Sequence, residues 1–273
     1  MPDRCNPDRS PLSAVVLAGE RPTGSPLAQA FSVPAGVLVP VAGRPAIARV
    51  FAALRASRSV NGGLLCGPER AVMAEAPALQ ALLAPGDFRW LAPQHGPAAS
   101  AMAALTSLER YPALVTTGDH ALLSPETLDD FCTRAQQRDE DVLVGLVPYD
   151  TVMAAFPETR RTALRFADAA WCGSNLFLFR TRAGLGAANF WREVEASRKR
   201  PWKIARHLGL GLLLRYLSHR LSLTEALAAI SERAGCRVGH VVLSDPRAAV
   251  DVDSIDDQNL AERLLESDRV GDR

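Results

Sequence analysis

The chain has 273 residues, of which 48% are hydrophobic and 22% are charged, and its formal net charge is +1. A chain of this length and composition can bury a substantial core and is typical of an ordinary globular protein. The nearly neutral charge gives no overall basic footprint for nucleic acid, so we expect no nucleic-acid partner. Any anionic ligand must therefore be bound by a local group of cations.

Three features predict a cytoplasmic protein. The five cysteines are scattered and show no C-x-x-C spacing, which argues against a zinc site or a disulfide framework and fits a reducing compartment. Residues 1–11 are polar and lack the apolar region of a signal peptide, so we interpret them as a disordered lead. No apolar run approaches the length of about 18 residues that a membrane span requires.

Apolar runs and helical periodicity alternate along the first half of the chain. After a first strand and a long loop through residue 34, strands are expected at 63–66, 88–91, 113–117 and 141–147, and helices at 46–56, 69–83, 98–108 and 126–138. This alternation predicts an α/β fold with a three-layer, doubly wound and mostly parallel sheet.

Beyond residue 147 the pattern is irregular. We expect a short helix at 151–156, strands at 162–166, 171–179 and 237–243, a helical stretch over 181–233, and a terminal helix to about residue 266. Some of these strands should be antiparallel additions to the sheet. The interpretation is one domain over 12–268, in which 148–235 is an acceptor-binding and helical C-terminal elaboration.

The apolar run Ala113–Thr117 ends in Thr-Thr-Gly-Asp, which puts Asp119 just past the carboxyl end of a parallel strand. Ligands bind at that end in open α/β sheets, and a buried carboxylate is costly unless it is paired or bound to a metal. Asp119 is therefore a candidate Mg²⁺ ligand next to a phosphorylated substrate. The alternative is that Asp119 caps a turn before the next helix, although Ser124 already supplies a cap there.

A second acidic motif, Asp251-Val-Asp253, lies near the end of the chain. At strand spacing both carboxylates project from one face, where their repulsion would be relieved by a divalent cation. The following Ser254 and Asp257 have the spacing of a capping box variant for the last helix. Capping explains those two residues but leaves Asp251 and Asp253 without a structural role.

Two loops follow strand ends on the same edge of the expected sheet. The loop that begins at Gly19 is a place where backbone amides can approach a phosphate, and it carries Arg21, a cation suited to phosphate. In the loop 92–100, Gln94 and Ser100 could read the edge of a nucleobase by hydrogen bonding. Ser100 could equally be a first-turn helix residue that satisfies the backbone.

Acceptor binding is expected in the second half of the chain. Asn175 should lie near the floor of the pocket, and the run of Arg160, Arg161 and Arg165 could line an anionic site or form a solvated face. The basic segment 198–206, which includes Lys199 and Lys203, has two interpretations. It is a clamp for a phosphate or a lipid headgroup, which implies peripheral membrane contact, or it is an ordinary junction between helices.

Taken in order, five of these segments resemble the MobA-like nucleotidyltransferases of the NTP-transferase superfamily, which have a Rossmann-like GT-A fold. They are Val-Val-Leu-Ala-Gly19, Leu-Val-Pro-Val-Ala-Gly-Arg-Pro45, the Gly96 to Ser100 loop, Thr-Thr-Gly-Asp119 and Val-Asp-Val-Asp253-Ser-Ile-Asp-Asp. The resemblance implies Mg²⁺-dependent transfer of a nucleoside monophosphate from an NTP to a small phosphorylated sugar, alcohol or lipid-headgroup precursor, with release of pyrophosphate. CTP is the first guess for the donor.

By motif position, the resemblance also implies roles for individual residues. Leu17, Ala18 and Gly19 would hold the triphosphate, and Gln94, Gly96 and Ser100 would meet the base. Asp119 and Asp253 would bind Mg²⁺ with Asp251 beside them, and Arg21 would add positive charge. Asn175, Arg165, Lys199 and Lys203 are the residues assigned to the acceptor.

The chain departs from the family pattern at one place. Members usually carry a lysine just before the Leu-x-Pro segment, whereas this chain reads Pro34-Ala35-Gly36 and has no lysine from Ser13 to Arg55. The missing lysine favours a non-catalytic nucleotide-binding protein as one alternative. A guanylyltransferase of the molybdenum cofactor and a glycosyltransferase that uses an NDP-sugar are two others. The sequence leaves the oligomeric state open.

Overall fold

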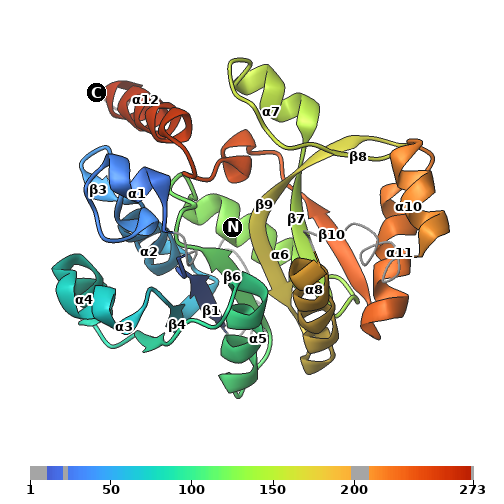
Figure 1. Cartoon of the computed structure of the whole chain (residues 1–273), viewed down its shortest axis with the longest axis horizontal. Helices are drawn as coiled ribbons and strands as arrows, with labels where there is room; N and C mark the ends of the chain where they lie inside the picture. The colour runs from blue at the N-terminus through green and yellow to red at the C-terminus, as the bar shows by residue number, and fades with distance from the viewer. Residues whose placement is uncertain (1–10, 21–23, 198–208, 272–273) are drawn as a thin grey trace, which may run out of the picture.

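The computed structural model describes residues 11–20, 24–197 and 209–271. Its main sheet has eight strands, seven of which follow the order β10-β7-β9-β6-β1-β4-β5, while β8 pairs with β9 off this path (Figure 1). The strands are β1 (Leu12–Leu17), β4 (Val60–Cys66), β5 (Phe88–Leu91), β6 (Ala113–Thr117), β7 (Val142–Pro148), β8 (Leu164–Arg165), β9 (Ala170–Phe179) and β10 (Val238–Val242). A separate hairpin pairs β2 (Pro40–Val41) with β3 (Arg44–Pro45).

The sheet is parallel except around one strand. The neighbours β5, β4, β1 and β6 run parallel, as do β7 and β10, whereas β9 is antiparallel to both β6 and β7 and to the short β8. The expected antiparallel addition is therefore present, and it stands in the middle of the sheet. Because β9 follows β7 after a short excursion, it can pair with β7 directly without a crossover helix.

Helices cover both faces of the sheet. They are α1 (Pro26–Ala30), α2 (Ala46–Ala56), α3 (Arg70–Glu75), α4 (Pro77–Leu83), α5 (Pro97–Ser107), α6 (Pro125–Gln136), α7 (Tyr149–Ala155), α8 (Leu185–Ser197), α10 (Leu210–Leu217), α11 (Leu223–Ala234) and α12 (Ile255–Gly271). Short 3-10 turns occupy η1 (Gly36–Leu38), η2 (Arg182–Gly184) and η3 (Pro246–Ala249).

Alternate residues of β1 point to opposite faces of the sheet, and each face carries its own part of the core. Val15 and Leu17 pack with α5 and α8 on one face, while Ala14 and Val16 pack with α2, α6 and α12 on the other. Figure 1 shows α5 and α8 side by side against the sheet. Both faces of a parallel strand are thus buried, which explains its continuous apolar sequence. The predicted three-layer, doubly wound fold is confirmed.

Some predicted boundaries were wrong, and proline explains two of them. The helix expected over 69–83 is divided into α3 and α4, because Pro77 disfavours helical geometry at Ala76. The loop expected through residue 34 contains α1, whose Ser25 cap accepts a hydrogen bond from the amide of Ala28 and whose first residue is Pro26. The strand expected over 162–166 is reduced to β8.

The helical stretch expected over 181–233 is interrupted in the described residues. It begins as η2 and α8, and after the undescribed residues 198–208 it continues as α10 and α11. In the described part of the chain, four cysteines are buried free thiols: Cys66, Cys132, Cys172 and Cys236. Within the same part, every helix is too short or too polar to cross a membrane.

Candidate active site

The carboxyl ends of β1 and β6 form one side of the candidate site. The amide of Gly118 donates to the carbonyl of Leu17 over 2.8 Å, which keeps the two strand ends together. A Cβ atom on Gly118 would lie 3.0 Å from Val37 Cγ1 and 3.3 Å from Ile47 Cδ1, so a side chain there would press on the core. Glycine at this position lets the chain turn closely and places Asp119 directly at the sheet edge.

The C-terminal acidic motif lies against the same place. The amide of Val252 donates to the carbonyl of Asp119 over 3.0 Å. The prediction that residues 251–253 have strand geometry was wrong, because this segment belongs to no strand. Val252 is nevertheless buried in the core, while Asp251 and Asp253 both lie within electrostatic reach of Asp119. We call Asp119, Asp251 and Asp253 the carboxylate cluster.

Asp119 and Asp251 of the carboxylate cluster are buried next to like charge, which is costly when no cation is bound, whereas Asp253 is exposed. Burial raises the pKa of Asp119 above its ordinary value, and the charges of Asp253 and Glu20 raise it further. Burial and the charges of Asp119 and Asp253 likewise raise the pKa of Asp251. The Oδ1 atoms of Asp119 and Asp251 are buried without a hydrogen-bond partner. Such atoms in a folded protein call for an explanation, and an absent ligand is one.

These carboxylates fit a metal that is shared with a substrate. In the residues that the structure describes, no three His, Cys, Asp or Glu side chains converge as a complete metal cluster. Mg²⁺ commonly uses one or two protein carboxylates, with waters and substrate phosphates as its remaining ligands. The two unpartnered oxygens of Asp119 and Asp251 match that requirement. The alternative in which Asp119 caps α6 is not needed, because Ser124 Oγ accepts the capping bond from Thr127 N over 3.0 Å.

Asn175 reaches the carboxylate cluster from an irregularity in β9. The register between β7 and β9 shifts next to Gly145, and Asn175 adopts a left-handed φ of 51°. At the shift, Ser174 Oγ donates to the carbonyl of Gly145 over 2.9 Å. The side chain of Asn175 acts as a hydrogen-bond donor toward Asp251 and opposes the rise of its pKa. Strained positions of this kind cluster at functional sites.

Two arginines of the run 160–165 have different surroundings. Arg165 lies on an exposed strand, with its guanidinium 5.1 Å from the centre of the Tyr149 ring. Arg161 has a side chain that is only 10% exposed, and its charge lowers the pKa of Asp251. Arg161 is therefore the arginine of the run that approaches the carboxylate cluster. The sequence alone did not distinguish it from Arg160 and Arg165.

The loop of residues 94–100, which we call the base loop, is held by hydrogen bonds within itself and to α8. Ser100 is 3% exposed, and its Oγ accepts from the amide of Gln94 over 2.9 Å. At the start of α5, Glu195 Oε2 accepts from the amide of Ala98 over 3.0 Å. Gly96 has a φ of 107°, which favours glycine. Of Gln94, Gly96 and Ser100, Gln94 is the one with an exposed side chain, and its Nε2 donates to the carbonyl of Ala92 over 3.4 Å.

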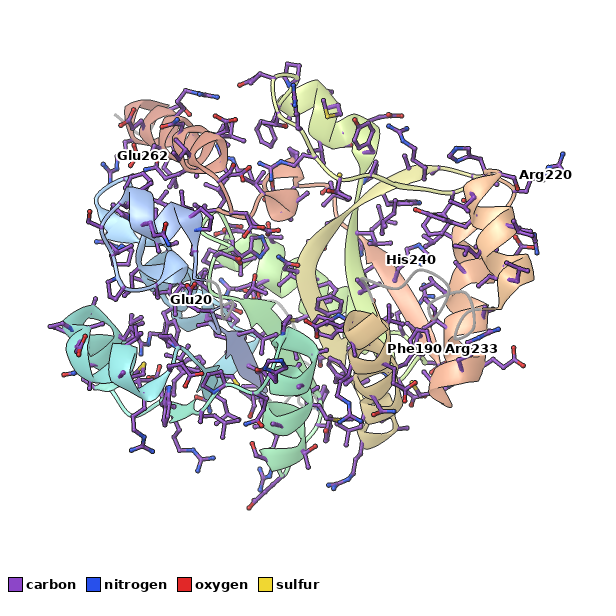
Figure 2. All side chains as sticks on the ribbon, in the orientation of Figure 1. Glu20, Phe190, Arg220, Arg233, His240 and Glu262 are labelled. Atoms are coloured by element: carbon purple, nitrogen blue, oxygen red, sulfur yellow. The ribbon has the colours of Figure 1, made fainter. Side chains whose placement is uncertain are left out.

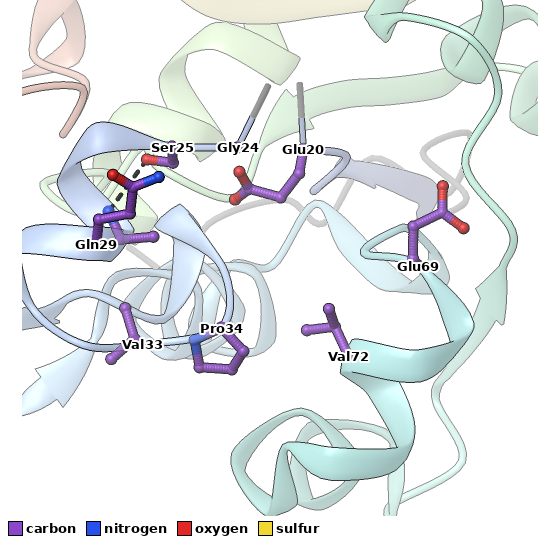
Figure 3. A pocket seen from close by; sticks show the side chains of 9 residues that line it. Glu20, Gly24, Ser25, Gln29, Val33, Pro34, Glu69 and Val72 are labelled. Carbon is purple, nitrogen blue, oxygen red and sulfur yellow. Dashed lines mark hydrogen bonds between the residues drawn. The ribbon is translucent and has the colours of Figure 1, made fainter. Parts of the chain in front are cut away.

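An open pocket of about 270 Å³ lies beyond the end of β1. Figure 3 shows Glu20 and Glu69 on opposite sides of it. The carboxylate of Glu20 accepts a hydrogen bond from the amide of Gly36, in the segment where the family lysine was expected. Glu20, labelled in Figure 2, thus brings an acidic group to this segment. Its charge also raises the pKa of Asp119, after the larger effect of burial. Leu17 and Ala18 are buried, and Gly19 follows them.

Several predicted residues lie outside the described residues: Arg21, Lys199, Lys203 and the rest of the basic segment 198–206. Lys199 and Lys203 are the only lysines of the chain. The described part of the site therefore contains no lysine that could replace the one missing from the family pattern.

Comparison with known proteins identifies the family of the chain. The MobA-like NTP transferase domain family matches residues 14–270. A hypothetical transferase from Thermus thermophilus is 31% identical, with a TM-score of 0.74 over 91% of this chain and 100% of that one. No curated protein matches the chain.

Two further solved structures are similar in fold alone. A 4-diphosphocytidyl-2C-methyl-D-erythritol synthase from Anaerococcus prevotii has 11% identity and a TM-score of 0.59, with 95% of this chain and 97% of that chain covered. A putative glucose-1-phosphate thymidylyltransferase from Bacillus anthracis has 14% identity and a TM-score of 0.60, with 93% and 94% covered.

Proposed function

Because the chain belongs to the MobA-like NTP transferase family and is a nucleotidyltransferase, we propose that it transfers a nucleoside monophosphate from an NTP to a small phosphorylated acceptor. The acceptor is a sugar, alcohol or lipid-headgroup phosphate, and the second product is pyrophosphate. The reaction requires Mg²⁺. Within the same class, guanylylation of the molybdenum cofactor remains the runner-up.

One observation carries this proposal: the buried, unpartnered Oδ1 atoms of Asp119 and Asp251 belong to segments that a backbone hydrogen bond joins. Two distant parts of the chain thus bring buried carboxylates together at the sheet edge where α/β proteins bind ligands. A purely structural role would leave both oxygens unsatisfied in the native state, which is costly.

The reaction balances without a covalent intermediate. An oxygen of the acceptor phosphate attacks the α-phosphorus of the NTP, and the bond from that phosphorus to the bridging oxygen breaks. Pyrophosphate leaves with the electron pair of that bond. The side chains of Asp119 and Asp251, with Asp253 beside them, would hold Mg²⁺, which supplies neutralisation of the charge on the triphosphate. Positioning of the two phosphates in line provides the rest of the catalysis.

CTP is the first donor to test. One neighbour of similar fold is named for a cytidyl product and another for a thymidylyl transfer, so the fold alone leaves the base open. Gln94, whose side chain is exposed on the base loop, can both donate and accept hydrogen bonds. It is therefore the residue we assign to contact with the base.

The test is a thermal-shift titration of the full chain with CTP, GTP, UTP and ATP, each with and without Mg²⁺. A ligand that binds only the native state raises the free energy of unfolding by mass action, by about 2.7 kcal/mol when its concentration is 100 times its dissociation constant. The melting temperature rises as a result. We expect one nucleotide to give a shift that depends on Mg²⁺. The variant Asp251→Asn should lose that dependence while it still folds.

A matched control is Asp268→Asn, which removes an exposed aspartate that pairs with Arg247 away from the carboxylate cluster. This variant should keep the shift of the unmodified chain. If none of the four nucleotides stabilises the unmodified chain, the proposed reaction is wrong and the non-catalytic interpretation is favoured.

A further inference from the structure

Arg161 lies between the carboxylate cluster and α12. Its Nη2 atom is 2.7 Å from Asp257 Oδ1 in the first turn of α12. Its charge opposes the rise that burial causes in the pKa of Asp251 and in the pKa of Cys172, a residue of β9. The Arg161 side chain is only 10% exposed. A cation is thus held at the edge of the site, on the side formed by the second half of the chain.

The hydrogen-bonding capacity of Arg161 is not used up by these neighbours. Nε is buried without a hydrogen-bond partner, and Nη2, although close to Asp257, is not aligned for a hydrogen bond with it. Arginine presents its donors as a planar fork that matches the oxygens of phosphate or carboxylate. Buried donors without partners are costly, so an anionic ligand with two oxygens would complete this arrangement.

A second ion pair also joins the loop after α7 to α12, and it provides a comparison for a purely structural contact. Glu158, in the loop after α7, pairs with Arg263 of α12 over 2.8 Å, and their side chains are 59% and 58% exposed. An exposed pair of this kind is enough to tie the loop to the helix at little cost. The burial of Arg161, with an unpartnered donor, is therefore not required for that purpose.

We propose that Arg161 binds the anionic group of the acceptor, a phosphate monoester in the reaction proposed above, and presents it beside the carboxylate cluster. The inference rests on the proposed function and names the residue that selects its substrate class. The cation lies near Asp251, where it would hold the attacking phosphate against the repulsion of the carboxylates. A phosphate dianion carries no proton that must be removed before attack, so the bound group can act directly as the nucleophile.

The chemistry that Arg161 recognises is shared by two kinds of acceptor. A phosphate monoester and the carboxylate of a sugar acid both offer two oxygens to a guanidinium. We therefore use inorganic phosphate and acetate as separate probes. The donor site is first saturated with Mg²⁺ and α,β-methylene-CTP, which cannot release pyrophosphate, or with the corresponding analogue of the preferred nucleotide, so that phosphate cannot bind there.

Calorimetric titration of the unmodified chain should then detect phosphate binding. Arg161→Gln should weaken it at least about tenfold, because a charge-assisted hydrogen bond is lost. Arg161→Lys, which keeps the charge but not the fork, should have an intermediate affinity and a nearly unchanged melting temperature. Arg263→Gln is the matched control, since it removes an arginine between the same two segments, and it should bind phosphate as the unmodified chain does.

The results separate failure of this inference from failure of the proposed function. Equal phosphate affinity of the unmodified chain and a folded Arg161→Gln variant overturns the role of Arg161 while the nucleotide reaction stands. If Arg161→Gln does not fold, the Arg161→Lys variant decides in the same way. Binding of acetate but not phosphate, again dependent on Arg161, keeps the residue and replaces the phosphate monoester by a carboxylate acceptor. An analogue that does not bind the unmodified chain counts against the proposed function and the inference together.

Discussion

The carboxylate cluster and the base loop lie on the same edge of the sheet but satisfy their polar groups in opposite ways. Asp119 and Asp251 keep buried oxygens without partners. In the base loop, Ser100 Oγ accepts from the amide of Gln94, and Glu195 Oε2 accepts from the amide of Ala98. The described residues thus provide no hydrogen-bond partner for these two carboxylate oxygens, whereas they provide partners for Ser100 and for the amides of Gln94 and Ala98 in the base loop.

This difference separates residues that bind from residues that hold a binding loop in shape. Ser100 was a candidate for the base, yet its hydroxyl is buried and engaged with the backbone, which agrees with the structural alternative. A buried group with no partner costs free energy in the native state, and a protein tolerates that cost most readily where a ligand removes it.

The largest effect is expected from Asp119→Asn. Loss of the carboxylate should reduce nucleotidyl transfer at least about 100-fold, since it removes an electrostatic contact at the reacting phosphates. The melting temperature should stay the same or rise, because the neutral amide no longer opposes Asp251 and Asp253 in a buried site. Pyrophosphate release and thermal melting measure the two outcomes. A variant that unfolds instead would indicate a structural role for Asp119.

The next effect is on the pH dependence of stability. Burial raises the pKa of Asp251 in the folded chain above its unfolded value, so protons bind the folded chain more tightly. Stability from this group is present at low pH and is lost as the pH rises through the raised pKa. In EDTA, the melting temperature of Asp251→Asn should exceed that of the unmodified chain by an amount that grows between about pH 5 and about pH 8.

Mg²⁺ with the preferred nucleotide should shrink that difference, because a bound cation stabilises the charged carboxylates. A difference in melting temperature between the two chains that does not vary with pH would mean that folding does not raise the pKa of Asp251.

The smallest effect is expected at the base loop. Ser100→Ala removes the acceptor of the Gln94 amide and should lower the free energy of unfolding by about 1 kcal/mol, with less than about tenfold loss of activity. Denaturant unfolding and initial rates measure both. A much larger loss of activity with unchanged stability would show that Ser100 contacts the base directly, and the contrast between the two regions would then fail.

The sequence alone determined most of the order of strands and helices and the sheet edge where the candidate site lies. Continuous apolar runs marked β1, β6 and β7, and the position of Asp119 after β6 followed from the run that precedes it. These features are local, since period and strand ends are written in neighbouring residues. Helix ends were less well predicted, as at Pro77, where a single residue divided the expected helix.

Only the tertiary structure decided which distant residues meet. The hydrogen bond from Val252 to Asp119, the left-handed Asn175 beside Asp251, and the burial of Arg161 rather than Arg165 all depend on packing between segments far apart in the chain. Composition and spacing alone did not distinguish Arg160, Arg161 and Arg165 from one another. Burial and the presence of partners distinguish them, and these are properties of the folded chain, because they depend on which other groups exclude water from each side chain.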